Sequence, residues 1–150
     1  MIALVQRVSR AHVEVADLGV TGSIGHGLCV FLCIVDGDSD IEADWLADKV
    51  SRLRVFADAR GRFDLSLKDT GGSMLLVSQF TLAGDARKGN RPSFTRAARP
   101  DAAIPLLARF RARIRESHGI RVEEGRFGAS MSVLIENDGP MTLQIDTESR

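Results

Sequence analysis

Short apolar runs, separated by glycines and charged residues, recur along this chain and predict a protein rich in β-strands. Two of the runs, at 28–35 and 74–77, are almost continuously apolar, which is typical of strands buried on both faces. The full set of predicted strands is 1–8, 12–16, 28–35, 54–56, 74–77, 120–124, 130–136 and 141–145. Residues 17–27 carry four glycines and are expected to form a turn-rich connection.

Two segments have the apolar spacing of helices. The first begins after Ser39, which has the spacing of a capping box with Glu42, and runs to about Leu53. The second spans about 101–118, with Asp101 placed to cap its start. Buried positions are expected at Leu46, Val50 and Leu53 in the first helix and at Leu107, Phe110 and Ile114 in the second. The order of elements predicts one α+β domain over residues 1–150, with two helices packed on sheet layers.

The composition supports a folded globular protein, since 44% of the 150 residues are hydrophobic and 27% are charged. A formal net charge of zero argues against binding of nucleic acid through overall basicity, although it allows a local basic strip. No apolar run reaches about 18 residues, the length of a membrane span. The first residues also lack the features of a signal peptide. We therefore expect a cytosolic protein that does not enter the membrane.

Residue types that carry metal or nucleophilic chemistry are scattered. The histidines are isolated from one another, at His12, His26 and His118. There is no Cys/His cluster and no H-E-x-x-H or G-x-S-x-G motif, and the acidic stretch 36–40 lacks the later ligands of a calcium loop. Cys29 and Cys33 lie in an apolar run and are expected to be buried and inert. The sequence thus predicts no metal and no cofactor, so any catalysis would use hydroxyls, backbone amides or the substrate.

A polar quartet follows the buried strand at 74–77 and consists of Ser78, Gln79, Phe80 and Thr81. Polar groups at the mouth of a core strand need partners or a purpose. One interpretation is that Ser78 and Thr81 satisfy the strand end and cap the next segment. The other is that the quartet forms part of a functional site.

The segment 83–100 contains two glycines and two prolines and is expected to be a long loop. It carries five basic residues against one acid, namely Arg87, Lys88, Arg91, Arg96 and Arg99 against Asp85. In a protein without net charge such a cluster indicates contact with phosphates, or else a solvated charged loop.

Two further features have open interpretations. Residues 137–140 interrupt the strand pattern with Gly139-Pro140, which is either a plain turn or an approachable backbone segment that holds a cis peptide bond. Arg7 falls on a face of the first strand that otherwise looks inward, so it either reaches solvent at the strand end or serves a site.

Taken together, four segments resemble the signature of the D-aminoacyl-tRNA deacylase family over essentially the whole chain. They are Gln6-Arg7-Val8, Ser78-Gln79-Phe80-Thr81-Leu82, Lys88-Gly89-Asn90-Arg91-Pro92-Ser93-Phe94 and Asn137 to Thr142. Four motifs in order and spacing are specific where any one would be weak. The chain departs from the family at Met141, where valine is commoner, and in extra residues at 17–20.

The resemblance implies a fold of two helices on layered, mainly antiparallel sheets (α/β/β). It also implies a cytoplasmic homodimer that hydrolyses the ester of D-aminoacyl-tRNA, and of glycine mischarged on alanine tRNA, without a metal. Two alternatives remain: an inactive tRNA- or RNA-binding module of the same fold, and a thiol- or serine-dependent esterase of small molecules.

Residue roles also follow from the resemblance. Gly139 and Pro140, joined by a cis peptide bond, would enter the active site of the partner subunit and exclude L-amino acids. Met141 adjoins this turn and would also line the substrate pocket. Arg7 would steady the turn. Phe94 would pack near the terminal adenine.

The quartet would carry the chemistry in this family. Ser78 and Gln79 would line the pocket, and N–H groups around Phe80 would form the oxyanion hole. Thr81 would be either a supporting residue or a nucleophile. The tRNA phosphates would be held by Arg87, Lys88 and Arg91.

Overall fold

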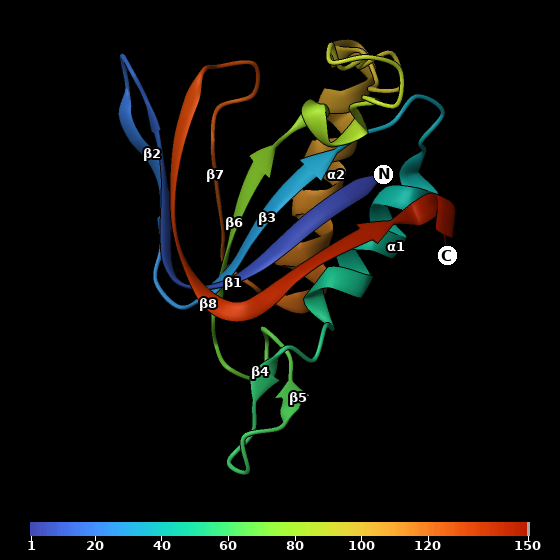
Figure 1. Cartoon of the computed structure of the whole chain (residues 1–150). Coiled ribbons are helices and arrows are strands. Elements are labelled where there is room, and N and C mark those ends of the chain that lie inside the picture. Colours follow the sequence, from blue (N-terminus) through green and yellow to red (C-terminus); the bar gives the residue numbers. More distant parts are fainter. Residues whose placement is uncertain (150) are drawn as a thin grey trace.

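One long strand organises the sheet. In the computed structural model, which describes residues 1–149, β1 (Ile2–Val15) pairs antiparallel with β2 (Gly19–Ile24), β3 (Gly27–Cys33) and β8 (Met131–Asp146). β3 continues the sheet in parallel with β6 (Ser73–Ser78), and β6 pairs in parallel with β7 (Val122–Glu124). The strand order is β2-β1-β3-β6-β7, with β8 also on β1, so the sheet is mixed with mainly antiparallel pairs (Figure 1).

Two helices pack on one side of this sheet (Figure 1). They are α1 (Asp40–Ser51) and α2 (Pro100–His118), and their apolar faces join the strands in the main core. Leu46, Val50, Phe110 and Ile114 are fully buried there, as the spacing predicts, because they recur on one face of each helix. Leu53 and Leu107 pack against the same core from partly buried positions.

The helix ends are built as the sequence predicts, with one exception. Ser39 and Glu42 form the expected capping box, and Gly119 adopts a left-handed φ of 65° that ends α2. The exception is Asp101, which is not the cap. The helix starts one residue earlier, at Pro100, whose fixed φ and missing N–H suit the first helical position.

Charged side chains join the two helices along their exposed edge. Arg109 binds Asp40 and Asp44, and Arg113 makes two hydrogen bonds to Asp48. The ring of His118 also lies 2.7 Å from Asp48. These hydrogen bonds, led by that from Arg113, hold the pKa of the Asp48 carboxyl well below its usual range.

Several predicted strand boundaries are wrong. The strands expected at 1–8 and 12–16 form one strand. Ser9 and Arg10 are exposed within it, and the pairing with β8 resumes at Arg10 after a shift in register. Residues 19–24 form β2 rather than part of a turn, since main-chain pairing with β1 tolerates glycines at a sheet edge. The strand β8 runs through 137–140, where irregular register with β1 absorbs the turn.

Two smaller features complete the fold. The strand expected at 54–56 begins later, as a hairpin of β4 (Phe56–Ala57) and β5 (Phe63–Leu65) that projects from the body of the protein (Figure 1). The C-terminal segment is fastened to the first residue, because Thr147 is buried and its N–H donates to the carbonyl oxygen of Met1. The short 3₁₀ turn η2 (Thr147–Ser149) follows, and residue 150 lies outside the described residues.

Candidate active site

The polar quartet lies where β6 ends and the chain turns. The N–H of Gln79 donates to the carbonyl of Leu32 at 2.9 Å, which ties the end of the strand to β3. The next residues form a single 3₁₀ turn, η1 (Phe80–Ala83). The N–H groups of Phe80 and Thr81 open this turn, where no earlier carbonyl of the turn can accept them. Within residues 1–149 they have no hydrogen-bond acceptor, so they are available to an external oxygen.

Side chains of the quartet contact each other and Phe94 of the loop at 83–100. Gln79 donates from its amide nitrogen to the hydroxyl of Thr81. The exposed ring of Phe80 meets Phe94 edge to face, with centroids 5.3 Å apart. An amide does not remove a proton from a hydroxyl at neutral pH. The polar contact of Thr81 therefore does not activate it as a nucleophile.

A cavity of about 740 Å³ adjoins the quartet. Its walls are residues 78–80, the start of α2 with the loop before it at 94–103, and the segment 127–133. Among the described residues that line it, Arg99 carries the only charged side chain, and no histidine or carboxylate is present. The cavity can thus bind and orient a substrate, but it supplies no general base.

Sequence reasoning placed Arg99 in the basic cluster but not in a cavity wall, and it missed a second part of this wall, the segment 127–133. The signal for the second was available in Phe127, an aromatic residue between Gly125 and Gly128 that remains 41% exposed. Glycines around an exposed aromatic ring indicate a segment shaped for contact.

Cys33 lies directly below the turn. Its thiol is 3.5 Å from the carbonyl oxygen of Phe80, and burial raises its pKa. Burial also raises the pKa of Cys29 to about 12. Both cysteines are buried, as expected, and a protonated thiol is a poor nucleophile. The geometry therefore does not favour a thiol esterase.

The Gly139-Pro140 turn is a separate, exposed feature. The peptide bond between the two residues is cis, as expected, and Met141 beside it packs partly against the main core. Arg7 is buried rather than pointing to solvent. It donates to the carbonyl oxygens of Asp138 at 3.2 Å, Gly139 at 3.5 Å and Val55, and pairs with the Asp138 carboxylate at 2.8 Å.

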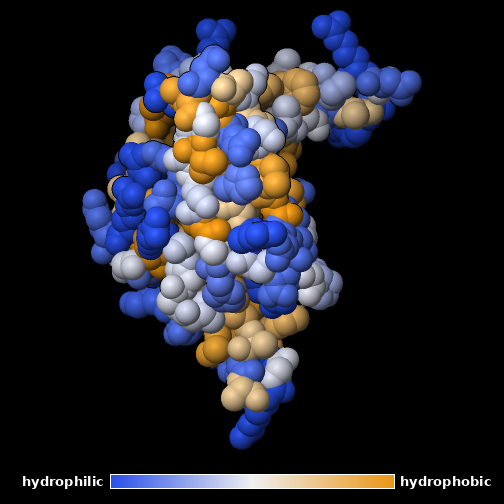
Figure 2. Space-filling model, turned by 90° about the vertical axis from the view of Figure 1, so that its left-hand side faces the viewer, coloured by the Kyte–Doolittle hydropathy of each residue, from blue (hydrophilic) through white to orange (hydrophobic). Residues whose placement is uncertain are grey.

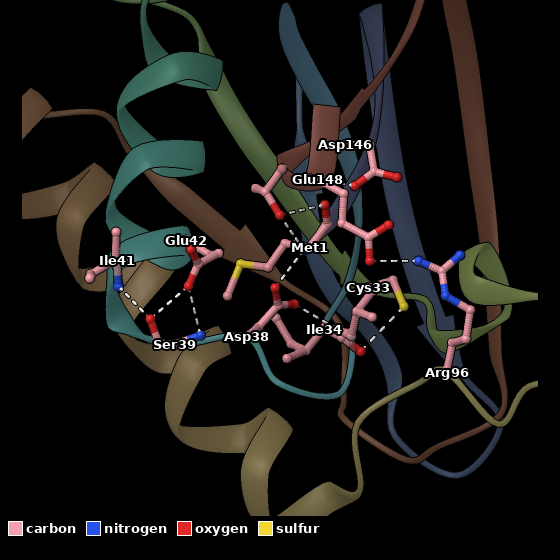
Figure 3. Close-up of polar contacts among 12 residues, drawn as sticks. Met1, Cys33, Ile34, Asp38, Ser39, Ile41, Glu42, Arg96, Asp146 and Glu148 are labelled. Carbon is pink, nitrogen blue, oxygen red and sulfur yellow. Dashed lines mark hydrogen bonds and ion pairs between the residues drawn. The ribbon is translucent and has the colours of Figure 1, made fainter. Parts of the chain in front are cut away.

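The basic loop divides into paired and unpaired residues. Arg87 is bound by Asp85, and Arg96 by Glu148, which fastens the base of the loop (Figure 3). Lys88 and Arg91 are exposed and form no ion pair within residues 1–149. The end of this loop, including Phe94 and Arg99, reaches the cavity, whereas Arg87, Lys88 and Arg91 lie outside its lining.

Comparison with known proteins shows the family of this chain. A family model described as D-Tyr-tRNA(Tyr) deacylase matches residues 4–146. The chain belongs to this deacylase family. Curated D-aminoacyl-tRNA deacylases are similar along their full length: one from Ruegeria sp. is 51% identical, covering 100% of this chain and 95% of the relative. Another, from Paracidovorax citrulli, is 53% identical, covering 97% of this chain and 92% of the relative.

Solved structures agree with the fold of the deacylase. A structure named c-Myc DNA Unwinding Element Binding Protein superposes with a TM-score of 0.92 at 38% identity, over 98% of this chain and 99% of the other. A probable eukaryotic D-amino acid tRNA deacylase superposes with a TM-score of 0.83 at 20% identity, over 96% of this chain and 97% of the other. At this identity the likeness shows the shared fold alone. The enzyme class expected from the four motifs is confirmed: the protein is a hydrolase of the D-aminoacyl-tRNA deacylase type.

Neither a candidate membrane-spanning helix nor a group of metal ligands is found among residues 1–149 of the deacylase. None of its described helices is both long and apolar enough to cross a membrane. Within the same residues, no three histidine, cysteine or acidic side chains gather as metal ligands would.

Proposed function

We propose that this deacylase acts in the cytoplasm as a homodimer, in which each cavity is completed by the Gly139-Pro140 turn of the other subunit. Its substrates are tRNAs that carry a D-amino acid or glycine at the 3′ end, including glycine mischarged on alanine tRNA. It removes them by hydrolysing the ester, and so proofreads the handedness of aminoacyl-tRNA.

The observation that carries this proposal is the separation of the two motifs within one chain. Val8 pairs with both Asn137 and Gly27, which places the turn near the first residue of β3. Ser78 instead pairs with Leu32, near the last residue of β3. Five residues of strand span roughly 16 Å, so the turn does not reach the cavity of its own chain. If both motifs contact one amino acid, a second copy has to supply the turn.

The surface supports an association of two copies. The face formed by β2 and β8 shows apolar patches between charged side chains (Figure 2). Leu134 on β8 is 54% exposed, and Val20 on β2 and Leu18 just before it are exposed as well. Large exposed apolar side chains close together favour contact with another protein surface.

Selection by handedness would come from main-chain atoms. The carbonyl oxygens of Gly139 and Pro140 would accept from the substrate amino group and occupy the space of an L side chain. Rigid backbone touches only the groups around the substrate Cα, so it distinguishes D from L without reading the side chain. Glycine has no side chain to exclude and would pass. Met141 would extend the same wall.

The chemistry would rely on positioning rather than on a protein base. The free N–H groups of Phe80 and Thr81 would stabilise the oxyanion that forms when water attacks the ester carbonyl. Ser78 and Gln79 would line the pocket beside that carbon. Since none of the described residues that line the cavity is a histidine or a carboxylate, we assign activation of water to the neighbouring 2′-hydroxyl of the terminal ribose. Thr81 would orient Gln79.

The nucleic acid would follow the basic loop. Lys88 and Arg91 are free to contact phosphates, and Arg87 would join them by exchanging its Asp85 partner for a phosphate. Phe94, at the cavity rim beside Phe80, would pack against the terminal adenine.

The test combines an assay with subunit mixing. The wild-type protein should release D-tyrosine, but not L-tyrosine, from charged tRNA. Gly139→Val should block the partner's cavity, and Phe80→Pro should remove an oxyanion donor. A Cβ at 139 meets only the side-chain amide of Asn137, at 3.3 Å, so the variant should fold.

Mixed dimers of the two variants would hold one intact cavity with an intact turn. Refolding the variants together should therefore restore roughly a quarter of the wild-type activity, because half of the dimers are mixed and each has one good site. No recovery above the separate variants would show that each chain supplies its own turn, and the proposal would be wrong.

A further inference from the structure

An aromatic ring covers the arginine that holds the Gly139-Pro140 turn. The guanidinium carbon of Arg7 lies 5.2 Å from the ring centroid of Phe63, within the range of a cation–π contact. Phe63 lies on β5 of the projecting hairpin and is 51% exposed. Its place over a buried cation gives this exposed ring a physical role.

Phe63 is presented by a rigid hairpin. Asp58 accepts from the N–H groups of Arg60 and Arg62 and pairs with the Arg62 side chain, which fixes the turn between β4 and β5. The base of the hairpin is anchored by Phe56, which is buried against His26 with ring centroids 4.9 Å apart. The ring is therefore held over Arg7 by the body of the protein.

Arg7 joins the hairpin to the turn. One of its nitrogens donates to the carbonyl of Val55 at the base of the hairpin, and another reaches the carbonyl of Gly139. The second contact is long, at 3.5 Å, so a small rotation of the guanidinium breaks it. A planar group with a ring on one face keeps its plane better than one with water there.

We propose that Phe63 is a positioning residue: acting through Arg7, it fixes the orientation of the Gly139 carbonyl and so sharpens the discrimination between D- and L-amino acids. The inference rests on the proposed function of that turn. Phe63 touches no reacting atom in this scheme. Loss of the ring lets the turn move, so L-substrates are cleaved faster and D-substrates more slowly.

The readout is the ratio of kcat/KM for D-tyrosyl-tRNA to that for L-tyrosyl-tRNA. Phe63→Leu, which keeps an apolar side chain but loses the ring, should lower this ratio by roughly two- to fivefold, the size of one partly exposed cation–π contact. Phe63→Tyr should keep the wild-type ratio. Arg60→Ala, on the same hairpin and away from Arg7, is the matched control and should also keep it.

A double-mutant cycle assigns the effect to Arg7. In an Arg7→Gln background there is no cation under the ring, so Phe63→Leu should change the ratio no further. An equal fall in both backgrounds, or an unchanged ratio for Phe63→Leu in the wild type, would overturn the inference. If the wild type itself does not discriminate, the proposed function fails, which is a different result from a selective wild type with a silent Phe63→Leu variant.

Discussion

At the scale of the residue, the proposed role of the Phe80 N–H as an oxyanion donor can be tested with a single substitution. Proline at the first position of a short helical turn keeps the backbone angles but removes the donor. Phe80→Pro should lower kcat by about a hundred- to a thousandfold, the cost of one oxyanion donor.

The control for that variant is Phe80→Ala, which loses the ring and its contact with Phe94 but keeps the N–H. This variant should raise KM by a larger factor than it lowers kcat, as measured with D-tyrosyl-tRNA. Equal losses of kcat in the two variants would assign the effect to the ring.

Thr81 separates the positioning mechanism from a nucleophilic one. Its hydroxyl is bound by the Gln79 amide, which cannot act as its base. Thr81→Ala should retain at least a tenth of the wild-type kcat, because only an orienting contact is lost. Complete loss of turnover, with an unchanged melting temperature, would revive the nucleophile.

The sequence singles out candidate site residues, but it does not give their arrangement. The quartet and the Gly-Pro turn stand out because their polar or flexible residues break an apolar pattern. Their separation within one chain, by contrast, depends on the register of β3 with β1 and β6, which no local pattern encodes. The contact between Phe63 and Arg7 joins residues 56 positions apart and was equally invisible.

At the scale of the element, the ion pairs between α1 and α2 predict a pH-dependent stability. The pKa of Asp48 is lowered in the fold, chiefly by Arg113, so its contribution is present above the unfolded pKa of about 3.9 and is lost as the pH falls below it. Asp48→Asn should reduce the free energy of unfolding by about 1–2 kcal/mol at pH 7.

The measurement for Asp48 is urea unfolding at pH 7 and at pH 3. The difference between wild type and variant should shrink at pH 3, because the Asp48 carboxyl of the unfolded chain is then largely protonated while that of the folded protein stays ionised, so folding has to release a proton. A difference that does not change with pH would show that the pair with Arg113 and His118 contributes through packing alone.

The helices were predicted more accurately than the strands, for a physical reason. A helix satisfies its own backbone, so local spacing and a capping box such as that of Ser39 and Glu42 largely define it. A strand depends on its neighbours. Residues 19–24 look like a turn until β1 offers them an edge, and 137–140 look like an interruption until the same strand carries them.

At the scale of the whole molecule, the proposed mechanism makes the tRNA a participant in its own hydrolysis. A D-tyrosyl-tRNA that ends in 2′-deoxyadenosine should be cleaved about a hundredfold more slowly, since general-base assistance is lost. Binding of this substrate, measured by competition, should be nearly unchanged. Cleavage at the normal rate would require a base elsewhere.

The pairing of β1 with three other strands has a consequence for how the protein opens. Both the helix-covered part of the sheet and the layer made with β2 and β8 are hydrogen-bonded to this one strand. Amide protons in β1 and β3 should therefore exchange with solvent only when the entire sheet comes apart, and at one common rate. Arg7 lies on β1 and contacts the Gly139 carbonyl. A change that loosens the proposed selection by handedness without denaturing the protein therefore has to act on the exposed turn rather than on this strand.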